Sequence, residues 1–347
     1  MYLDLIEKKT KDVSESWLYI IDENIKESDI ELLVSQKIVI LTNRFDIYEK
    51  LQASDLKVFF NDFDLSVFDD RNFSQIFYRV SKEKAVTHHI IDNVERLLCD
   101  KGKLILCGRK NDGIKSYAEK AAKSFGSLIQ IKKNGSIYLG TATRSIQENK
   151  GASKIEAHDK NYSKLRACIP YLNHYLVSKP GIFGWEKIDN GSKLLGNFIA
   201  DFLTLFDEPP QNILDLGCGY GYLSALLNTH TKAKIIATDN NAAAILACTE
   251  NFSKLNINGE VIADDCAQNI KKSFDAVLCN PPFHKGFVTD GHLTKKFAHS
   301  SYLHLKKGGM ALFVVNCFIP LEKYTNEFLH TKTITKNKSY KLILLVK

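Results

Sequence analysis

The feature that most constrains the fold is a strand-helix-strand pattern between residues 212 and 239. A short apolar run, Asn212–Leu216, is followed by three alternate glycines, Gly217, Gly219 and Gly221. A second apolar run, which ends at Asp239, comes after a helical segment that begins near Tyr222. Glycines between a strand and a helix let the backbone turn tightly and approach a ligand closely. The pattern predicts a parallel α/β sheet with a ligand-binding turn at the carboxyl end of one strand.

Carboxylates on either side of this turn indicate the kind of ligand. Asp239 lies 22 residues beyond Gly217, where a carboxylate can accept hydrogen bonds from both hydroxyls of an adenosine ribose. Asp215 would lie close to the pyrophosphate of a dinucleotide but would suit the cationic amine of an aminoacyl ligand. Because the spacing is G-x-G-x-G and not G-x-G-x-x-G, we favour an adenosyl-amino-acid site over the NAD site of a dehydrogenase, which stays open as an alternative.

Polar side chains also follow the next two predicted strands. Residues 259–263 precede Asp264 and Asp265, and residues 274–279 precede Asn280. Each of these residues alone could be a turn or cap residue. Because ligands of an open doubly wound sheet lie at the carboxyl ends of its strands, four polar residues at four strand ends predict one site, formed by Asp215, Asp239, Asp265 and Asn280.

The tetrad Asn280-Pro281-Pro282-Phe283 ends the fourth of these strands. Two adjacent prolines cannot continue a strand ladder or a helix, so the backbone leaves the sheet in a stiff, extended form. An ordinary turn would explain the prolines alone. Together with the other strand ends, the tetrad predicts fixed acceptors at Asn280 and Pro281, with the Phe283 ring beside them, which suits a planar amine.

The first half alternates apolar runs with helical patterns, among them a helix predicted over residues 84–99, and it has no glycine-rich turn. We therefore expect an α/β scaffold without a cofactor site. Residues 144–162 are polar and lack periodicity, which predicts a linker and two domains, residues 1–155 and 156–347. Beyond the linker, an apolar periodicity predicts one helix over residues 194–206, with Asp189 or Asn190 as its N-cap.

Composition limits the classes of protein and partner. No apolar run approaches the roughly 18 residues of a membrane span, and the N-terminus lacks a signal-peptide pattern, so we expect a cytoplasmic protein without a membrane partner. Eight cysteines without a C-x-x-C pair predict free thiols and no metal site. Residues 1–150 hold 24 Lys/Arg against 23 Asp/Glu, and the rest 23 against 17. The basic excess near the C-terminus, which includes Lys336, Lys338 and Lys341, fits either a polyanion partner or a solvated surface.

These motifs resemble the class I S-adenosylmethionine-dependent methyltransferases. The resemblance narrows to the RsmC-type ribosomal RNA guanine-N2 methyltransferases through four segments: Lys179-Pro-Gly-Ile-Phe183, Asp189-x-Gly-Ser192, Asn280-Pro-Pro-Phe-His284 and Asn316-Cys-Phe-Ile-Pro320. It covers the second half and extends more weakly to Gly108–Gly113. It implies two tandem Rossmann-like domains, the first degenerate and the second a doubly wound seven-stranded sheet, acting as a monomer on ribosomal RNA or the small subunit.

The resemblance also implies an activity and residue roles. The reaction would transfer a methyl group from S-adenosylmethionine to the N2 amine of a guanine in 16S ribosomal RNA; the alternatives are a guanine in 23S RNA or another N-methyltransferase with the same tetrad. Asn280, Pro281, Pro282 and Phe283 would be catalytic, with Phe283 placed to stack on the flipped target base. The cofactor would be held by eight residues: Asp215, Gly217, Gly219, Gly221, Asp239, Asp265, Lys179 and Phe183. Among these, Asp265 would hold the adenine amine, and Lys179 and Phe183 would close over the cofactor or the target. The loop after Phe183 and the pair Asp264-Asp265 depart from the family pattern, which leaves the choice of RNA target open.

Overall fold

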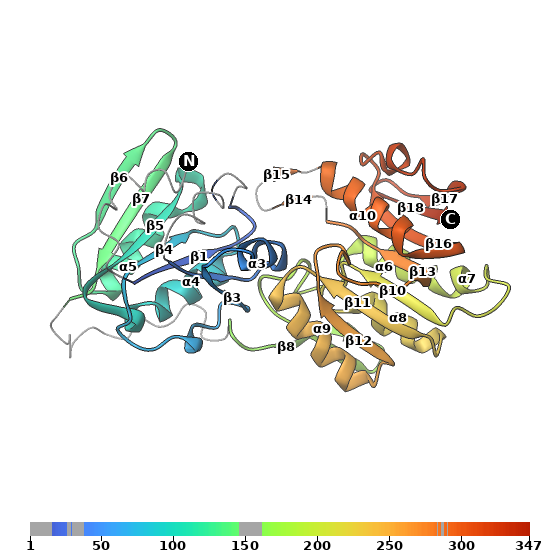
Figure 1. Ribbon diagram of the computed structural model, residues 1–347, viewed down its shortest axis with the longest axis horizontal. Helices are drawn as coiled ribbons and strands as arrows, with labels where there is room; N and C mark the ends of the chain where they lie inside the picture. The colour runs from blue at the N-terminus through green and yellow to red at the C-terminus, as the bar shows by residue number, and fades with distance from the viewer. Residues whose placement is uncertain are drawn as a thin grey trace. The chain divides into compact units, whose positions relative to one another are not determined.

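The computed structural model describes residues 16–25, 29, 38–145, 162–282, 284–285, 288–289 and 291–347, without the side chains of residues 283–292. The chain divides into two compact units, residues 1–164 and residues 165–347 (Figure 1). The predicted domain boundary at residue 155 falls in the segment 146–161, outside the described residues. We describe each unit separately.

The N-terminal unit is built on a seven-stranded sheet with the order β3-β2-β1-β4-β5-β7-β6. All neighbours are parallel except β7, which runs antiparallel to β5 and β6. The strands are β1 (Trp17–Ile21), β2 (Val39–Thr42), β3 (Lys57–Phe60), β4 (Phe73–Arg79), β5 (Leu98–Arg109), β6 (Gln130–Asn134) and β7 (Ile137–Thr143). The described α-helices of this unit are α3 (Phe45–Gln52), α4 (Lys84–Asn93) and α5 (Ile114–Ser124).

The C-terminal unit repeats this topology, with the order β12-β11-β10-β13-β16-β18-β17. Its strands are β10 (Asn212–Leu216), β11 (Lys234–Asp239), β12 (Gly259–Ala263), β13 (Phe274–Cys279), β16 (Leu305–Asn316), β17 (His330–Lys336) and β18 (Tyr340–Val346). Its α-helices are α6 (Asn190–Gly196), α7 (Ile199–Leu203), α8 (Tyr222–His230), α9 (Ala242–Leu255) and α10 (Gly291–His304). Two hairpins, β8 (Arg166–Tyr171) with β9 (His174–Ser178) and β14 (His284–Lys285) with β15 (Val288–Thr289), stand outside the sheet. The expected fold class is confirmed.

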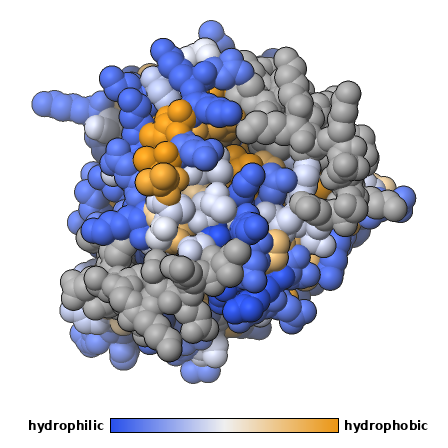
Figure 2. Space-filling view, turned by 90° about the vertical axis from the view of Figure 1, so that its left-hand side faces the viewer, coloured by the Kyte–Doolittle hydropathy of each residue, from blue (hydrophilic) through white to orange (hydrophobic). Residues whose placement is uncertain are grey.

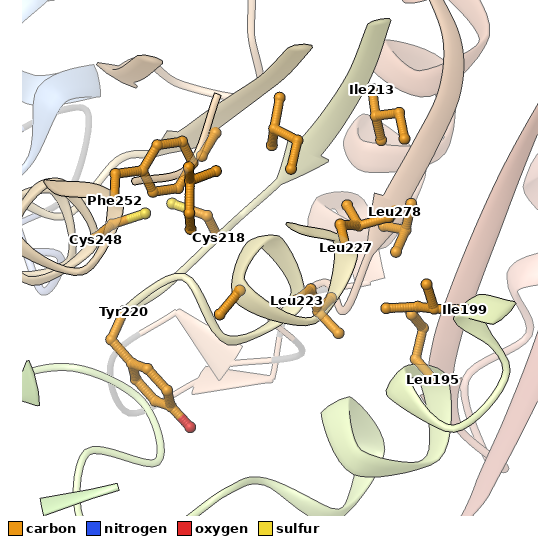
Figure 3. Close-up of a cluster of buried hydrophobic side chains, with 14 of the residues drawn as sticks. Leu195, Ile199, Ile213, Cys218, Tyr220, Leu223, Leu227, Cys248, Phe252 and Leu278 are labelled. Carbon is orange, nitrogen blue, oxygen red and sulfur yellow. The ribbon is translucent and has the colours of Figure 1, made fainter. Parts of the chain in front are cut away.

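Alternating side chains of the C-terminal strands bury two apolar layers. On one face, Ile213, Ala276 and Leu278 pack against residues of α6 to α9 (Figure 3). On the other face, Leu214, Val277 and their neighbours pack against α10. Because both faces are covered, the central strands β10, β11 and β13 are mostly apolar, and the edge at which the parallel strands end is the place for polar groups.

Three boundaries differ from the sequence expectation. The helix expected over residues 84–99 ends at Asn93, because residues 95–97 form a 3₁₀ turn and β5 begins at Leu98. The single helix expected over residues 194–206 is two short helices, α6 and α7, of which the first begins four residues earlier because Asp189 is its N-cap. The third boundary concerns Lys307-Gly308-Gly309, whose two adjacent glycines predict a turn before a strand at residue 310. In the structure these residues lie inside β16, at an irregularity in its pairing with β13.

Figure 2 views the N-terminal unit from the side of β6, and the face it shows is largely hydrophilic around a small hydrophobic area. Three side chains beside and within β6 are exposed hydrophobics: Leu128, Ile129 and Ile131. In the parts of the chain that the structure describes, no helix is long and apolar enough to cross a membrane. The same residues contain no cluster of His, Cys, Asp and Glu that could hold a metal ion.

Candidate active site

The pairing register brings the predicted site residues to one edge of the C-terminal sheet. Leu216, the last residue of β10, pairs with Thr238 of β11 on one side and with Cys279 of β13 on the other. Asp239 pairs in turn with Ala263 of β12. The glycine turn, Asp239, Asp265 and Asn280 therefore follow adjacent strands at the same edge, as the sequence analysis expected.

The glycine turn folds back onto the end of β11. The amides of Gly217 and Cys218 both donate to the Thr238 carbonyl at 2.9 Å, and the Gly219 amide donates to Oδ2 of Asp239 at 2.9 Å. Gly219 has φ +54°, and a Cβ there would have no neighbour within 4 Å. Gly221 has φ +86°, and its Cβ would lie 2.8 Å from Sγ of Cys248. The turn thus requires glycine for packing at one position and leaves its backbone open to a ligand at the other.

Packing beneath the turn is dense. In Figure 3 the sulfurs of Cys218, in the turn, and Cys248, on α9, point toward each other. The neighbouring Cys248 thiol and burial raise the pKa of Cys218 well above its usual value, and burial raises the pKa of Cys248, so both groups stay protonated at neutral pH. The buried side chain of Asn251 ties the turn to β9 by donating to the carbonyls of Val177 and Tyr220. The glycine turn is therefore held in place by buried contacts with α9 and β9.

Asp215 is the penultimate residue of β10 and is fully buried. Its Oδ2 accepts hydrogen bonds from the amide and the hydroxyl of Ser224 on α8, at 3.1 and 2.6 Å. Its Oδ1 is buried without a hydrogen-bond partner. Burial raises the pKa of Asp215 to about 6, and the bonds from Ser224 offset part of that rise. A buried, orphaned carboxylate oxygen fits a cationic donor from a ligand.

Asp239 is half-buried, and its two oxygens are both oriented by the backbone. Oδ2 accepts from Gly219 and Oδ1 accepts from the amide of Asn241, each at 2.9 Å. Each carboxylate oxygen can accept more than one hydrogen bond, so the group remains able to receive two hydroxyls. These contacts fix the orientation of the carboxylate, and its ribose role stays a prediction.

Two neighbouring acids at the end of β12 differ in environment. Asp264 is buried and its Oδ2 accepts from the Asn269 amide at 3.0 Å. Asp265 is half-buried, and its Oδ2 pairs with the ammonium of Lys296 on α10. An adenine amine at Asp265 would therefore have to share the carboxylate with Lys296. The adenine role of Asp265 stays a prediction.

The loop that follows β9 joins the same edge through its backbone. Asn241, which lies two residues after Asp239, donates a hydrogen bond from its side chain to the Gly181 carbonyl at 2.9 Å. Within this loop Lys179 is 1% exposed and Phe183 is 67% exposed. An exposed phenyl ring beside a cofactor edge suits a closing role better than a fully buried lysine does. Both assignments stay predictions.

Asn280 has an orientation that sequence reasoning did not anticipate. Its Nδ2 donates to Oδ2 of Asp189 at 2.9 Å and to the hydroxyl of Ser192 at 2.8 Å. A carboxylate can only accept, so the amide nitrogen must face Asp189 and the amide oxygen must point elsewhere. The two partners were visible in the Asp189-x-Gly-Ser192 motif, but the sequence offered Asp189 only as a helix cap, which it also is.

Other parts of the predicted catalytic tetrad are less defined. Pro281 is buried and Pro282 is exposed. Phe283 lies outside the described residues, so its stacking role stays a prediction. Ser224 and Asn241, which orient Asp215 and Asp239, were missed, because a serine inside a helix and an asparagine at a helix start carry no sequence signal beyond capping.

Comparison with known proteins identifies the family. Residues 173–344 match the family model of the methyltransferase small domain. The chain is 30% identical over 274 residues to the ribosomal RNA small subunit methyltransferase C of Buchnera aphidicola subsp. Schizaphis graminum, covering 78% of this chain and 76% of the relative. It is 29% identical over 322 residues to the protein of the same name from Buchnera aphidicola subsp. Cinara cedri, covering 90% and 87%.

A solved structure shares the fold of the whole chain. The T. thermophilus 16S rRNA N2 methyltransferase (RsmC), in complex with AdoMet and guanosine, superimposes with a TM-score of 0.80 at 22% identity, over 99% of this chain and 91% of that one. The relative that is 30% identical is matched over more than two thirds of both chains, and the family model covers most of the C-terminal unit. The chain therefore belongs to the ribosomal RNA small subunit methyltransferase C family.

Proposed function

We propose that this protein transfers a methyl group from S-adenosylmethionine to the exocyclic N2 amine of a guanine in 16S ribosomal RNA. The observation that carries the proposal is the fixed orientation of Asn280, whose amide nitrogen is held by Asp189 and Ser192. That orientation leaves the amide oxygen as an acceptor at the edge of the sheet where the cofactor turn also lies. Family membership supports the same reaction.

The residues at this edge fit the cofactor. The orphaned Oδ1 of Asp215 suits the ammonium of the methionine portion, the open backbone at Gly219 admits close approach, and Asp239 presents two oriented oxygens to the ribose hydroxyls. When bound, S-adenosylmethionine supplies an electrophilic methyl group on a sulfonium. Asp215 would lose its burial penalty on pairing with the ammonium, which favours the ionised carboxylate in the bound state.

The chain's contribution to chemistry is positioning. The lone pair of a guanine N2 amine is delocalised into the ring, so attack requires the nitrogen to become tetrahedral. The Asn280 oxygen and the Pro281 carbonyl would accept the two amine hydrogens and favour that geometry as positive charge develops. Proton loss to water can then follow methyl transfer, so the mechanism needs no strong general base.

Two measurements test the proposal. Mass spectrometry of nucleosides from the ribosomal RNA of a strain lacking this protein should show the loss of one N2-methylguanosine from 16S RNA. Loss from 23S RNA would move the target to the large subunit. Calorimetry of the purified protein should show binding of S-adenosylhomocysteine, and tighter binding of NAD would overturn the assignment in favour of a dehydrogenase.

The N-terminal unit and the setting of the protein complete the proposal. We propose that residues 1–155 act as a scaffold that positions RNA, because the turn after β1 has no glycine to admit a cofactor. The protein would act as a monomer in the cytoplasm on ribosomal RNA or the small subunit, without a metal or membrane partner. An expressed N-terminal unit should give no thermal shift with S-adenosylhomocysteine, and a shift equal to that of the whole protein would contradict the scaffold role.

A further inference from the structure

A polar groove of about 430 Å³ lies in the C-terminal unit, beside the predicted active-site edge. Its volume is within the 300–1,000 Å³ that small-ligand sites commonly occupy. One wall comes from α6 and the other from the turn that joins β17 to β18. A leucine and a serine line it together with two lysines, three asparagines and a tyrosine: Lys193, Lys338, Asn190, Asn197, Asn337 and Tyr340. No carboxylate is among the residues that line it.

The groove and the catalytic asparagine share a partner. Asp189 holds the Asn280 amide through Oδ2, and its Oδ1 lies 3.4 Å from the hydroxyl of Tyr340. The ring of Tyr340 also packs closely against Gly191: a Cβ on Gly191 would lie only 3.0 Å from it. In addition, Tyr340 of β18 pairs with Asn316 at the carboxyl end of β16, and β16 is the strand next to β13. Asp189 therefore has the target acceptor on one side and the groove on the other.

Building on the proposed function, we propose that this groove binds the nucleotide next to the target guanine, with its phosphate held by Lys193 and Lys338. Both lysines are exposed and line the same groove, and no carboxylate is among its lining residues. Two cations suit a phosphodiester, and the amides of Asn190 and Asn197 can donate to phosphate oxygens or to the edge of an unpaired base. A flipped guanine requires its neighbours to be held while it enters the pocket.

The other basic residues of this region do not form the site. Lys341, which the sequence analysis grouped with Lys336 and Lys338, is 7% exposed, and its ammonium donates to both oxygens of Glu322 at 2.7 and 2.6 Å. It is committed to an ion pair and is not available to a phosphate. Of the three tail lysines, Lys338 is the one that lines the groove.

The test uses the full-length double variant Lys193→Gln/Lys338→Gln with unmethylated 16S RNA. RNA binding should weaken about tenfold at 0.15 M salt, and the slope of log affinity against log salt should become shallower by about 0.7, the value for one phosphate of a single strand. The KM for RNA should rise in parallel, with kcat and the affinity for S-adenosylhomocysteine unchanged. A slope equal to that of the parent would overturn the groove as an RNA site.

A matched control removes the same charge elsewhere on the same unit. Lys232 and Lys271 are exposed and lie at the amino ends of β11 and β13, the opposite edge of the sheet. The variant Lys232→Gln/Lys271→Gln should keep RNA affinity within about twofold and retain more of the parent slope than the groove variant. An equal loss in both variants would show general charge attraction and overturn the proposal. Because RNA binding is read without turnover, an enzyme that binds RNA but methylates no guanine would refute the proposed function and leave this result interpretable.

Discussion

The two sheets share one strand order, yet the strand ends carry different residues. In the C-terminal unit, β10 runs into three glycines with positive φ, β11 ends on Asp239, and β13 runs into Asn280. In the N-terminal unit, β2 is followed by Asn43 and β4 by Val80, and the turn after β1 reads Asp22-Glu23-Asn24 without a glycine. The difference teaches that the shared topology supplies an edge, and that a few residues at the strand ends turn the edge into a site.

Each unit has a buried aspartate at its first sheet strand in the chain, Asp22 or Asp215, but the surroundings of the two differ. Asp22 is 3% exposed after β1, its Oδ1 accepts from the Asn24 backbone and side chain, and its Oδ2 is buried without a hydrogen-bond partner. Burial raises its pKa to about 7. Asp215 has a similar orphaned oxygen but lies beside an open glycine turn. Asp215 thus lies beside the glycine turn, whereas Asp22 lines a small cavity of about 40 Å³.

The largest effect should come from breaking the difference at the second strand. Asp239→Ala removes the ribose acceptor and the support of the Gly219 amide, so S-adenosylhomocysteine affinity should fall about 1,000-fold, from two charge-assisted bonds of about 1.5–3 kcal/mol each. Asn43→Ala, at the matching strand end of the N-terminal unit, should leave that affinity unchanged. Calorimetry on both variants decides, and a similar loss in both would mean that the N-terminal unit also binds cofactor.

Next is the fourth strand end. Asn280→Ala should lower kcat about 100-fold with little change in cofactor affinity, because its oxygen acts on the target amine. Ser192→Ala should lower kcat by less, about tenfold, since Asp189 still holds the amide. Ser81→Ala, after β4, is the control and should leave kcat unchanged. Lost cofactor binding with normal turnover in Asn280→Ala would reassign this residue to the cofactor.

Replacing each buried aspartate by asparagine compares the two units by their effect on the free energy of unfolding. A folded-state pKa near 6 for Asp215, above the unfolded value, means that the native state holds the proton more tightly, so stability falls as pH rises from about 4 to about 6. Asp215→Asn should therefore raise the free energy of unfolding at pH 8 by about 1–2 kcal/mol while weakening S-adenosylhomocysteine binding at least tenfold.

The matching variant is Asp22→Asn, for which the same sign applies between about pH 4 and pH 7. It should stabilise the protein at pH 8 to a similar degree and leave cofactor binding intact. Urea unfolding at pH 5 and pH 8, with and without S-adenosylhomocysteine, separates the two. If Asp215→Asn kept full cofactor affinity, its orphaned oxygen would not be the ammonium partner.

The smallest effect concerns the glycine turn itself. Gly219→Ala meets no atom within 4 Å but places a side chain at φ +54°, so it should cost about 1 kcal/mol of stability and obstruct the cofactor. Gly135→Ala, in the β6-β7 turn at φ +58° with equally open surroundings, is the matched control. Both variants should lose about the same free energy of unfolding, but S-adenosylhomocysteine binding should weaken in Gly219→Ala alone. Equal binding in both would show that the turn does not contact the ligand.

Much of the C-terminal unit was predictable from sequence, and less of the N-terminal one. The bounds of β10, β11 and β13 were predicted closely because these central strands are largely buried and therefore read as apolar runs. The bounds of β12 were predicted equally closely, although it is an edge strand whose residues are exposed or half-buried. In contrast, β4 has the sequence Phe-Ser-Gln-Ile-Phe-Tyr-Arg, and edge strand β6 is exposed at every residue, so neither has a clear apolar pattern. Tertiary pairing, and not local sequence, makes them strands.

The site divides in the same way. Alignment of strand ends placed Asp215, Asp239 and Asn280 at one edge, because parallel pairing follows from the order of elements. The links from Asp189 and Ser192 to Asn280 span 91 and 88 residues, and the ion pair between Asp265 and Lys296 spans 31. Side-chain contacts across such separations depend on rotamers and loop paths that no periodicity in the chain records.

The position of β18 has a consequence for biosynthesis. Although β18 follows β17 in the chain, it lies between β16 and β17 in the sheet. During translation β17 therefore emerges before the strand that must join it to the sheet. Tyr340, the first residue of β18, supplies the hydroxyl beside Asp189, so the support of Asn280 is completed only when β18 has left the ribosome. The acceptor at Asn280 would thus be assembled after β10, β11 and β13 have emerged, and not together with them.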